Sequence, residues 1–354
     1  MSKNPLDYLP PPKASPLDSW RGLGGWLAGF SIVLGCLLTL TVWLVVKLTG
    51  DAWHWGTVLL FAPRWLGLIP WAIGTPLLLF ARPWQRWLWI TTGVIGGISL
   101  MGFNIPIPRW HSQDGTTLRV MTCNIQKDEI SLFGIESLIE EYDLDIVFLQ
   151  EFNSEGTIQW PAGWHAFSDR GQCIGSRFPM TKKTVCQQDP TNDRSRTSGL
   201  LATLQLPNQT VNVASLHLLT PRWGLAEVLS QDGTQLDGRF ERLKSETDMR
   251  SAESEWTRVA CDRFGALDIV AGDFNMPVDS RILVRDWGSY RDAFASAGWG
   301  LGYTKYETFR GWNLRARIDH ILVKPDLVTK WCEVGRDVGS DHRPVIAEIE
   351  LPSQ

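Results

Sequence analysis

The sequence predicts a two-layered β-sandwich covered by helices, preceded by a region that associates with a membrane. Charge and tryptophan are divided unevenly. Residues 1–110 carry a net charge of +5 and eleven of the 19 tryptophans, whereas residues 111–354 carry a net charge of −9. The first part holds long uncharged apolar runs, and the second part interleaves strand patterns with helical patterns without internal repeats. This combination favours an α/β sandwich domain behind a membrane region.

Residues 1–21 are polar and rich in proline, which predicts a disordered tail. Residues 22–108 then contain three uncharged runs, namely Gly22–Val46, Trp65–Ala81 and Trp87–Pro108. About 20 apolar residues are enough to cross a bilayer, and tryptophans near the ends of such runs are typical of membrane interfaces. We therefore predict about three transmembrane helices and the lipid bilayer as a partner. Two helices remain an alternative if the proline-containing second run is re-entrant.

The first run is too long for a cleaved signal peptide and lacks a small-x-small cleavage site. Buried helices of a soluble domain would carry more charge than these runs do.

The distribution of lysine and arginine slightly favours a cytoplasmic N-terminus, which with three spans puts the C-terminal domain outside the cytoplasm. The prediction is thus a multi-pass integral membrane protein with an extracytoplasmic domain, and losing one span would reverse the orientation.

Residues 109–354 are predicted to form the soluble domain. Helical spacing of apolar residues predicts helices over 130–142 and about 236–264, with a long loop over 219–236. Alternating or continuously apolar runs predict strands over the following ranges: 118–124, 145–151, 198–206, 209–218, 268–271, 317–323 and 345–351.

Polar side chains stand at the ends of strand after strand in this domain. A buried carboxylate is costly unless it is paired or bound to a metal, so repeated placement at strand ends indicates one common site. The residues in question are Asn124, Glu151, His217, Asp273 with Asn275, Asp319, and Asp341 with His342.

This set of side chains suits the cleavage of a phosphate ester. A hard cation, bound by carboxylate and amide oxygens, neutralises the phosphoryl oxygens. A histidine whose tautomer is fixed by a carboxylate can activate water near neutral pH. Fixed donors then stabilise the negative charge of the transition state.

The motifs around these residues resemble those of the endonuclease/exonuclease/phosphatase superfamily, which includes deoxyribonuclease I, exonuclease III and Mg²⁺-dependent sphingomyelinases. The resemblance extends over about Leu118 to Leu351. It implies a four-layer αββα sandwich of two mixed β-sheets. The matching segments, in chain order, are Cys123-Asn124, Leu149–Glu151, Ser215–His217, Gly272–Asn275, Ile318–Ile321 and Ser340–Pro344.

The resemblance also implies a metal site. Glu151 and Asn124 would hold Mg²⁺, with Mn²⁺ as a possible substitute, and Asp341 would assist directly or through water. Gln126 stands where many relatives place an acid, so the resemblance leaves open whether one or two metal ions bind.

The remaining motif residues would handle water and phosphate. The resemblance implies that His342 is the general base and that Asp319 orients it. Asp273 and Asn275 would position the water and the phosphate, and His217 would donate a hydrogen bond to a phosphoryl oxygen. A lone histidine in an apolar strand, such as His217, is by itself more often a core residue.

Other polar residues near the motifs receive weaker predictions. His320 alternates to the opposite face from Asp319 and is interpreted as structural. Cys123 is interpreted as a small core residue. Arg196 and Arg222 are predicted to line the substrate groove, although arginines in loops are usually only solvated.

The six cysteines show no Cys-x-x-Cys motif and no spacing that suits zinc. Cys173 and Cys186 flank a predicted hairpin. They could form a disulfide in an oxidising compartment, or remain two buried free thiols.

These features together predict a membrane-anchored, divalent-metal-dependent phosphodiesterase or nuclease. The substrate is a phosphodiester in a nucleic acid or in a lipid head group. A charge of −9 weakens the case for a nuclease that grips a duplex, because such enzymes usually present a basic face. The alternative from another class is a catalytically silent binding protein on the same fold, and no protein partner is inferred.

Overall fold

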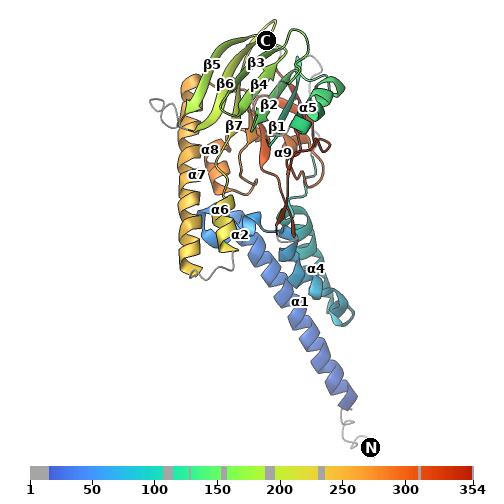
Figure 1. Ribbon diagram of the computed structural model, residues 1–354. Helices are drawn as coiled ribbons and strands as arrows, with labels where there is room; N and C mark the ends of the chain where they lie inside the picture. The colour runs from blue at the N-terminus through green and yellow to red at the C-terminus, as the bar shows by residue number, and fades with distance from the viewer. Residues whose placement is uncertain are drawn as a thin grey trace, which may run out of the picture. The chain divides into compact units, whose positions relative to one another are not determined.

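The structure of the chain is a computed structural model, and it describes residues 16–106, 115–126, 129–152, 158–187, 196–229, 236–309 and 312–352 (Figure 1). The chain divides into two compact units. Unit 1 consists of Met1–Trp43 and Trp65–Leu100, and unit 2 consists of Leu44–Arg64 and Met101–Gln354. Of the predicted tail, residues 1–15 lie outside the described residues, and helix α1 begins at Pro16. The second unit includes residues 44–64, which the sequence analysis assigned to the membrane region.

Unit 1 is a small bundle of helices, whose core is formed by Ile32, Cys36 and Ala81. Trp71 and Trp89 stack with ring centroids 4.4 Å apart, and each indole donates to the backbone carbonyl of the other. Its helical segments are α1 (Pro16–Leu48, which runs on into unit 2), η3 (Arg64–Leu68), α3 (Ile69–Ile73), η4 (Thr75–Phe80), α4 (Pro83–Ile95) and η5 (Gly96–Leu100).

The prediction of a multi-pass membrane protein is not supported. Among the described helices, only Gly24–Leu48 within α1 is by itself long and apolar enough to cross a membrane. The second predicted run is broken into short helical segments, because Pro70 and Pro76 cannot donate helical hydrogen bonds. The third run is helical only up to Leu100, which is too short for a bilayer about 30 Å thick.

Unit 2 contains two six-stranded mixed sheets. Their strand orders are β13-β14-β1-β2-β4-β3 and β5-β6-β7-β8-β12-β9. In the first sheet the strands are β1 (Thr117–Asn124), β2 (Ile146–Gln150), β3 (His165–Asp169), β4 (Gln172–Ser176), β13 (Val328–Val334) and β14 (Val345–Glu350). In the second they are β5 (Met180–Gln187), β6 (Thr197–Gln205), β7 (Thr210–His217), β8 (Ile269–Asp273), β9 (Arg291–Asp292) and β12 (Asp319–Val323).

Helices α5 (Glu129–Glu141), α7 (Leu236–Phe264) and α8 (Arg281–Trp287) cover the outer faces of these sheets (Figure 1). One apolar core lies between the sheets, where Phe148 of the first sheet and Leu200 of the second belong to the same cluster. A second core packs α5 on the first sheet, and a third packs α7 and α8 on the second. The four-layer αββα sandwich is therefore confirmed.

Further segments of unit 2 lie outside the two sheets. The predicted loop over 219–236 contains a short helix, and a separate two-stranded hairpin lies between β9 and β12 in the chain. These segments, with the helical elements of Leu44–Arg64, are η2 (Gly50–Ala52), α2 (His54–Phe61), α6 (Arg222–Val228), α9 (Ala293–Ala297), β10 (Lys305–Phe309) and β11 (Trp312–Ala316).

All six cysteines of the chain are buried and free. Cys173 lies on β4 of the first sheet and Cys186 on β5 of the second, so the alternative of two buried free thiols holds for this pair. A hydrogen bond with Cys186 and burial raise the pKa of Cys261 well above its usual value. The neighbour of Cys186 is thus Cys261, which lies on α7 across the helix–sheet interface.

Candidate active site

The strand order explains why the strand-end residues meet. β1 and β2 are parallel, and so are β7 and β8, so the carboxyl ends of all four strands deliver side chains to one edge of the sandwich. Asn124 ends β1, Glu151 follows β2, His217 ends β7 and Asp273 ends β8. The close packing of β7 on β8 requires Gly272, because a Cβ there would lie 2.0 Å from the carbonyl oxygen of Leu216.

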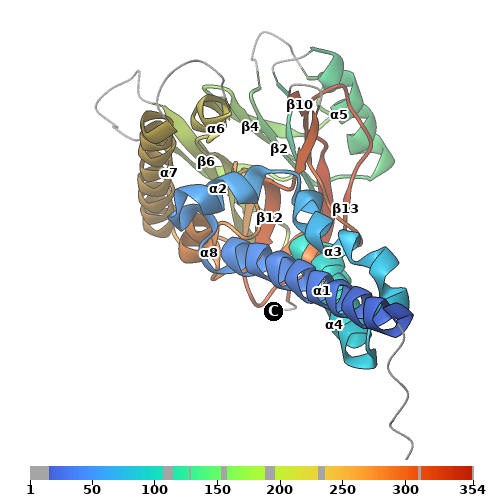
Figure 2. The same ribbon diagram turned by 90° about the horizontal axis from the view of Figure 1, so that it is seen from below.

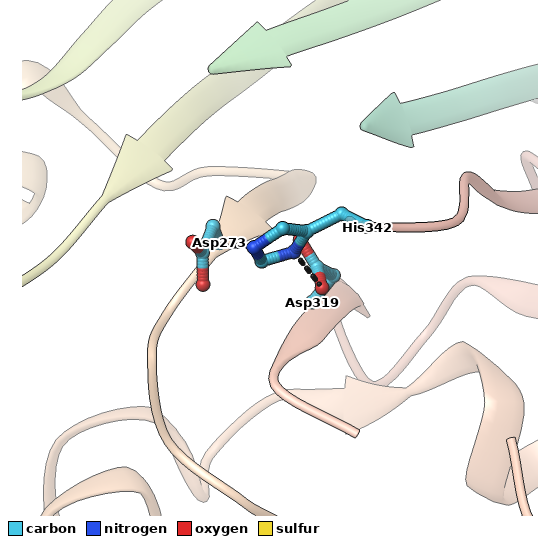
Figure 3. Close-up of side chains that lie close together, drawn as sticks. All are labelled: Asp273, Asp319 and His342. Carbon is cyan, nitrogen blue, oxygen red and sulfur yellow. Dashed lines mark hydrogen bonds and ion pairs between the residues drawn. The ribbon is translucent and has the colours of Figure 1, made fainter. Parts of the chain in front are cut away.

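His342 and Asp319 form a buried pair at this edge (Figure 3). The Nδ1 atom of His342 lies 2.8 Å from Oδ2 of Asp319, and Asp319 pairs in register with Asp273 across the antiparallel strands β12 and β8. The other ring nitrogen, Nε2, lies 3.8 Å from Oδ2 of Asp273. Figure 3 shows the imidazole between the two carboxylates. The fixed Nδ1 contact leaves Nε2 facing the site, as a general base requires.

The electrostatics of these three groups are linked. Burial alone would lower the pKa of His342, but the carboxylates of Asp319 and Asp273 raise it to about 9. Burial, together with the charge of Asp319, raises the pKa of Asp273 to about 6. Burial would also raise the pKa of Asp319, yet His342 lowers it below its usual value. Carboxylates therefore hold the proton on the imidazole, and any positive charge that neutralises them lowers the pKa of His342 toward neutrality.

Asp273 and Asn275 form a tight turn after β8. The backbone N–H of Asn275 donates to Oδ1 of Asp273 over 2.9 Å, and its side-chain amide donates to the carbonyl of Leu218 over 2.9 Å. Asn275 adopts a left-handed conformation with φ of 53°, which is uncommon for residues other than glycine. The backbone of Leu218, which is distant in sequence, thus helps to hold the side chain of Asn275 beside Asp273.

Asn124 and Glu151 lie next to each other on the first sheet. The amide of Asn124 donates to Oε1 of Glu151 over 3.2 Å and to Oδ2 of Asp273 over 3.1 Å. His217 joins them from the second sheet, with Nε2 3.9 Å from Glu151 Oε1 and 3.8 Å from Asp273 Oδ2. Glu151, like Asn275, has a positive φ, of 50°. Backbone strain therefore occurs at two positions of the site.

The donor set of the site fits a divalent cation. Asp273, Asp319 and His342 offer three ligand atoms within 4.8 Å of one another. Among the described residues, Asp319 Oδ1 and Asp341 Oδ1 are buried without a hydrogen-bond partner. Carboxylate oxygens without a hydrogen-bond partner are the hard oxygen ligands that such a cation takes. The predicted ligands Glu151 and Asn124 are adjacent, and Asp341 contributes one of the orphaned oxygens.

Lys305 is a site residue that the sequence analysis missed. Its ammonium group pairs with Oδ2 of Asp341, and its backbone forms an isolated β-bridge with His342. Lys305 also lines the pocket over the site, where it places a positive charge beside the carboxylates. No motif marks it in the sequence, because only the docking of the β10–β11 hairpin brings it to the site.

The site opens into a cavity of about 380 Å³. Asn124, Glu151, His217, Asp273, Asn275 and His342 line it from the two sheets. Arg222, which was predicted to line the substrate groove, and the exposed Trp223 line this cavity from α6. Arg196, by contrast, is bound by Glu253 and donates to the carbonyl of His217 over 2.8 Å. Arg196 therefore supports the backbone of β7.

The structural role expected of His320 agrees with its contacts. Its two ring nitrogens lie 2.8 Å from Asp292 Oδ2 and 2.8 Å from the carbonyl of Met276. Both contacts are on the face of β12 opposite His342. Cys123 is fully buried, and burial raises the pKa of its thiol well above the usual value, which excludes a nucleophilic role.

The chain is similar to several solved structures. D. rerio TDP2 complexed with single-strand DNA product is 18% identical with a TM-score of 0.48, covering 67% of this chain and 100% of that chain. The 3'-5' exonuclease NExo from Neisseria meningitidis is 21% identical with a TM-score of 0.49, covering 66% and 100%. A family protein from Bacteroides thetaiotaomicron is 16% identical with a TM-score of 0.47, covering 68% and 100%.

No curated protein matches the chain. The sequence model of the Endonuclease/Exonuclease/phosphatase family matches residues 121–342, which is more than half of the chain and includes every strand-end residue of the site. On this match, the chain belongs to the Endonuclease/Exonuclease/phosphatase family.

Proposed function

We propose that this protein is a divalent-metal-dependent phosphodiesterase that uses a water molecule activated by His342. The observation that carries the proposal is the buried Asp319–His342 pair, whose free Nε2 faces Asp273 at the floor of an open cavity. Membership of the family supports phosphoester hydrolysis in general. A paired histidine and carboxylate at a pocket floor is the arrangement that general-base catalysis needs.

In this mechanism, His342 Nε2 accepts a proton from water, and Asp319 keeps the imidazole in the correct tautomer. The separation of 3.8 Å between Nε2 and Asp273 Oδ2 is too long for a direct hydrogen bond but is short enough for one water molecule to contact both atoms. Asp273 and Asn275 hold that water and the phosphate. His217 donates to a phosphoryl oxygen, and the ammonium of Lys305 balances the charge that builds up.

Glu151, Asn124 and Asp341 would hold the cation, for which Mg²⁺ is the expected ion and Mn²⁺ a substitute. Bound there, the cation supplies positive charge to the phosphoryl oxygens. The buried amide of Asn124 orients the Glu151 carboxylate through its 3.2 Å hydrogen bond. This contact keeps the ligand oxygens in place before the substrate enters.

The test is hydrolysis of the soluble substrate bis(4-nitrophenyl) phosphate by the full chain in detergent, with Mg²⁺, with Mn²⁺ and with a chelator. The matched control is His342→Ala, which should remove activity while thermal unfolding stays cooperative. A wild-type protein that hydrolyses this ester with neither metal, and cleaves neither DNA nor RNA, would support the catalytically silent binding protein instead.

A second candidate function is hydrolysis of a phosphodiester in a lipid head group. The specific observation is the apolar lining of the cavity above the polar floor, formed by Phe61, Trp223, Leu225, Leu229 and Leu314. Such walls suit acyl chains. The basic residues of the same lining, Arg222, Lys305 and Arg315, suit the phosphates of either substrate class. Mixed micelles of sphingomyelin or phosphatidylcholine, compared with single-stranded and duplex DNA under the same conditions, distinguish the two.

We further propose that α1 crosses a membrane once and that unit 2 lies outside the cytoplasm. The apolar stretch Gly24–Leu48 supports the crossing. One span gives the same orientation as the predicted three, because both numbers are odd. A C-terminal alkaline phosphatase fusion that is active in cells would support this orientation, and an active fusion to a cytoplasmic reporter would contradict it.

A further inference from the structure

The segment Leu44–Arg64, hereafter the linker segment, belongs to the same compact unit as the active site. It contains the last turn of α1, η2 and α2. Figure 2 shows α2 beside α7 and α8, and the structure places α2 in contact with α7 and η2 in contact with α8. Gly50 and Asp51 are buried in this contact. The linker segment is thus packed into unit 2, although more than 50 residues separate it from β1.

Asp279 holds both ends of the linker segment. Its two carboxylate oxygens pair with Lys47 over 2.6 Å and with Arg64 over 2.5 Å, and its side chain is only 7% exposed. Asp279 follows Asn275 by four residues. Lys47 and Arg64 therefore bind the loop that follows Asn275 in the active site. Buried pairs of this kind fix geometry because breaking one leaves an uncompensated charge.

Asp51 at the centre of the linker segment contacts the same loop. Its carboxylate accepts hydrogen bonds from Ser280 Oγ over 2.5 Å and from the backbone N–H of Arg281 over 2.7 Å. These contacts cap the first turn of α8. The carboxylate is completely buried, and Oδ2 lies 3.9 Å from Nη1 of Arg250.

Arg250 carries the connection onward to the catalytic residues. It is 1% exposed on α7, donates from Nη2 to the backbone carbonyl of Asn275 over 2.8 Å, and donates from Nε to the carbonyl of Leu219 over 3.1 Å. Its guanidinium lies over the ring of Phe61 of the linker segment, at 5.8 Å. The two carbonyls belong to the loops that carry Asn275 and His217. Arg250 therefore joins two strand ends of the site to the linker segment.

A buried guanidinium needs a counter-charge to remain in place, because removing an unpaired charge from water is unfavourable. The carboxylate of Asp51 supplies part of that charge from the linker segment. Asn275 needs support from its backbone, since its left-handed φ of 53° is stable only when its surroundings impose it. The hydrogen bond from Arg250 to its carbonyl is such a support.

We infer that the linker segment is a working part of the catalytic centre, in which Asp51 acts through Arg250 as a positioning pair for Asn275. The catalytic geometry of Asn275 then depends on contacts with the linker segment. This inference rests on the proposed phosphodiester hydrolysis for its kinetic consequence, but the positioning of Asn275 can be measured without any turnover.

The experiment uses the full chain in detergent and compares Asp51→Asn with the control variant Asp286→Asn on α8. Both remove one largely buried carboxylate charge, but Asp286 pairs with Arg285, and only Asp51 of the two contacts Arg250. Hydrogen–deuterium exchange of the peptide covering Asp273–Met276 should rise at least about tenfold in Asp51→Asn and stay near the wild-type rate in Asp286→Asn. The kcat for bis(4-nitrophenyl) phosphate should fall about ten- to hundredfold in Asp51→Asn with KM within twofold, which is the range for a displaced catalytic group.

Unchanged exchange in Asp51→Asn overturns the inference, and so does raised exchange with an unchanged kcat. Equal effects of the two variants also overturn it, because they would indicate a general loosening of unit 2. If Asp51→Asn does not fold, Arg250→Lys replaces it, since lysine keeps the charge but cannot serve both carbonyls. A wild-type protein without hydrolytic activity would refute the proposed function, while the exchange comparison would still decide whether the linker segment positions Asn275.

Discussion

His342 and Asp319 meet through a 2.8 Å contact between Nδ1 and Oδ2, although they are 23 positions apart in the chain. Asp319 opens β12 of the second sheet, whereas His342 precedes β14 of the first sheet. The pair therefore joins the two halves of the sandwich. Ser340 reinforces this junction, because its hydroxyl donates to the carbonyl of Asn124 over 2.7 Å.

Asp319→Asn should lower kcat for a soluble phosphodiester by about 10²–10⁴-fold, the usual contribution of a positioned general base, while KM changes little. The amide cannot fix the imidazole tautomer as the carboxylate does. Steady-state kinetics at saturating metal provide the measurement. Asp326→Asn, an exposed acid just after the same strand, should match the wild type. A loss of kcat below about threefold in Asp319→Asn would contradict the role of Asp319 in orienting His342.

Glu151→Gln should weaken activation by the metal. The amide keeps the shape and the hydrogen-bonding reach of the side chain but removes the negative charge that attracts the cation. We expect the Mg²⁺ concentration for half-maximal activity to rise on the order of 10–100-fold. Titration of activity with Mg²⁺ gives this value, with the exposed Glu255→Gln on α7 as the control. An unchanged metal titration would show that Glu151 does not hold the cation.

Trp223→Ala tests the lipid candidate separately from catalysis. Trp223 is 63% exposed and lines the cavity from α6. If acyl chains occupy the apolar wall, the variant should lose about tenfold in kcat/KM for a micellar lipid phosphodiester, which corresponds to part of a buried aromatic contact. Its activity on bis(4-nitrophenyl) phosphate should stay within twofold. Trp299→Ala, at an equally exposed tryptophan that does not line this cavity, should change neither activity.

Asp292→Asn should destabilise unit 2 in a pH-dependent way. Asp292 pairs with Arg317 over 2.7 Å and contacts His320 Nδ1 over 2.8 Å, while its other oxygen accepts from the N–H of Ala295 at the start of α9. Burial alone would raise the pKa of Asp292, but Arg317 and His320 together lower it well below the usual value. The carboxylate therefore stabilises the fold at every pH above the unfolded pKa of about 4, and this contribution is lost as the pH falls through the folded pKa.

The expected loss for Asp292→Asn is about 3 kcal/mol in the free energy of unfolding at pH 7, as for other broken buried pairs. Urea unfolding of the two proteins at pH 7 and at about pH 3 should show the difference shrinking at the acid end. A difference that stays constant over this range would mean that the ion pairs of Asp292 contribute no stability.

Much of unit 2 could be predicted from the sequence because its patterns are local. The continuous apolar run before Glu151 predicts a strand buried on both faces, and the spacing within 236–264 predicts a helix with the observed bounds. Strand-end polarity indicated the site, since parallel strands carry their carboxyl ends to one edge. His342 and Asp319 could be assigned roles only through the resemblance of their motifs.

The features that were missed depend on tertiary contacts. Lys305 reaches the site because the β10–β11 hairpin packs beside His342. Arg196 forms an ion pair with Glu253 instead of lining the cavity. The prediction of three spans counted apolar residues and treated the prolines of the second run as tolerable within a span, whereas that run is divided into short helical segments. The linker segment contains both apolar and charged residues, so its composition gave no indication that it packs against α7 and α8.

The burial of all six cysteines has a practical consequence for the topology of the protein. Native thiols such as Cys173 and Cys186 cannot report which side of a membrane they occupy, because an impermeant reagent reaches them on neither side while the protein is folded. For the same reason, the folded unmodified chain gives no labelling signal from its native cysteines. A single cysteine introduced at an exposed position, as in Trp299→Cys or Glu255→Cys, would then report the side of unit 2 without removal of any native thiol.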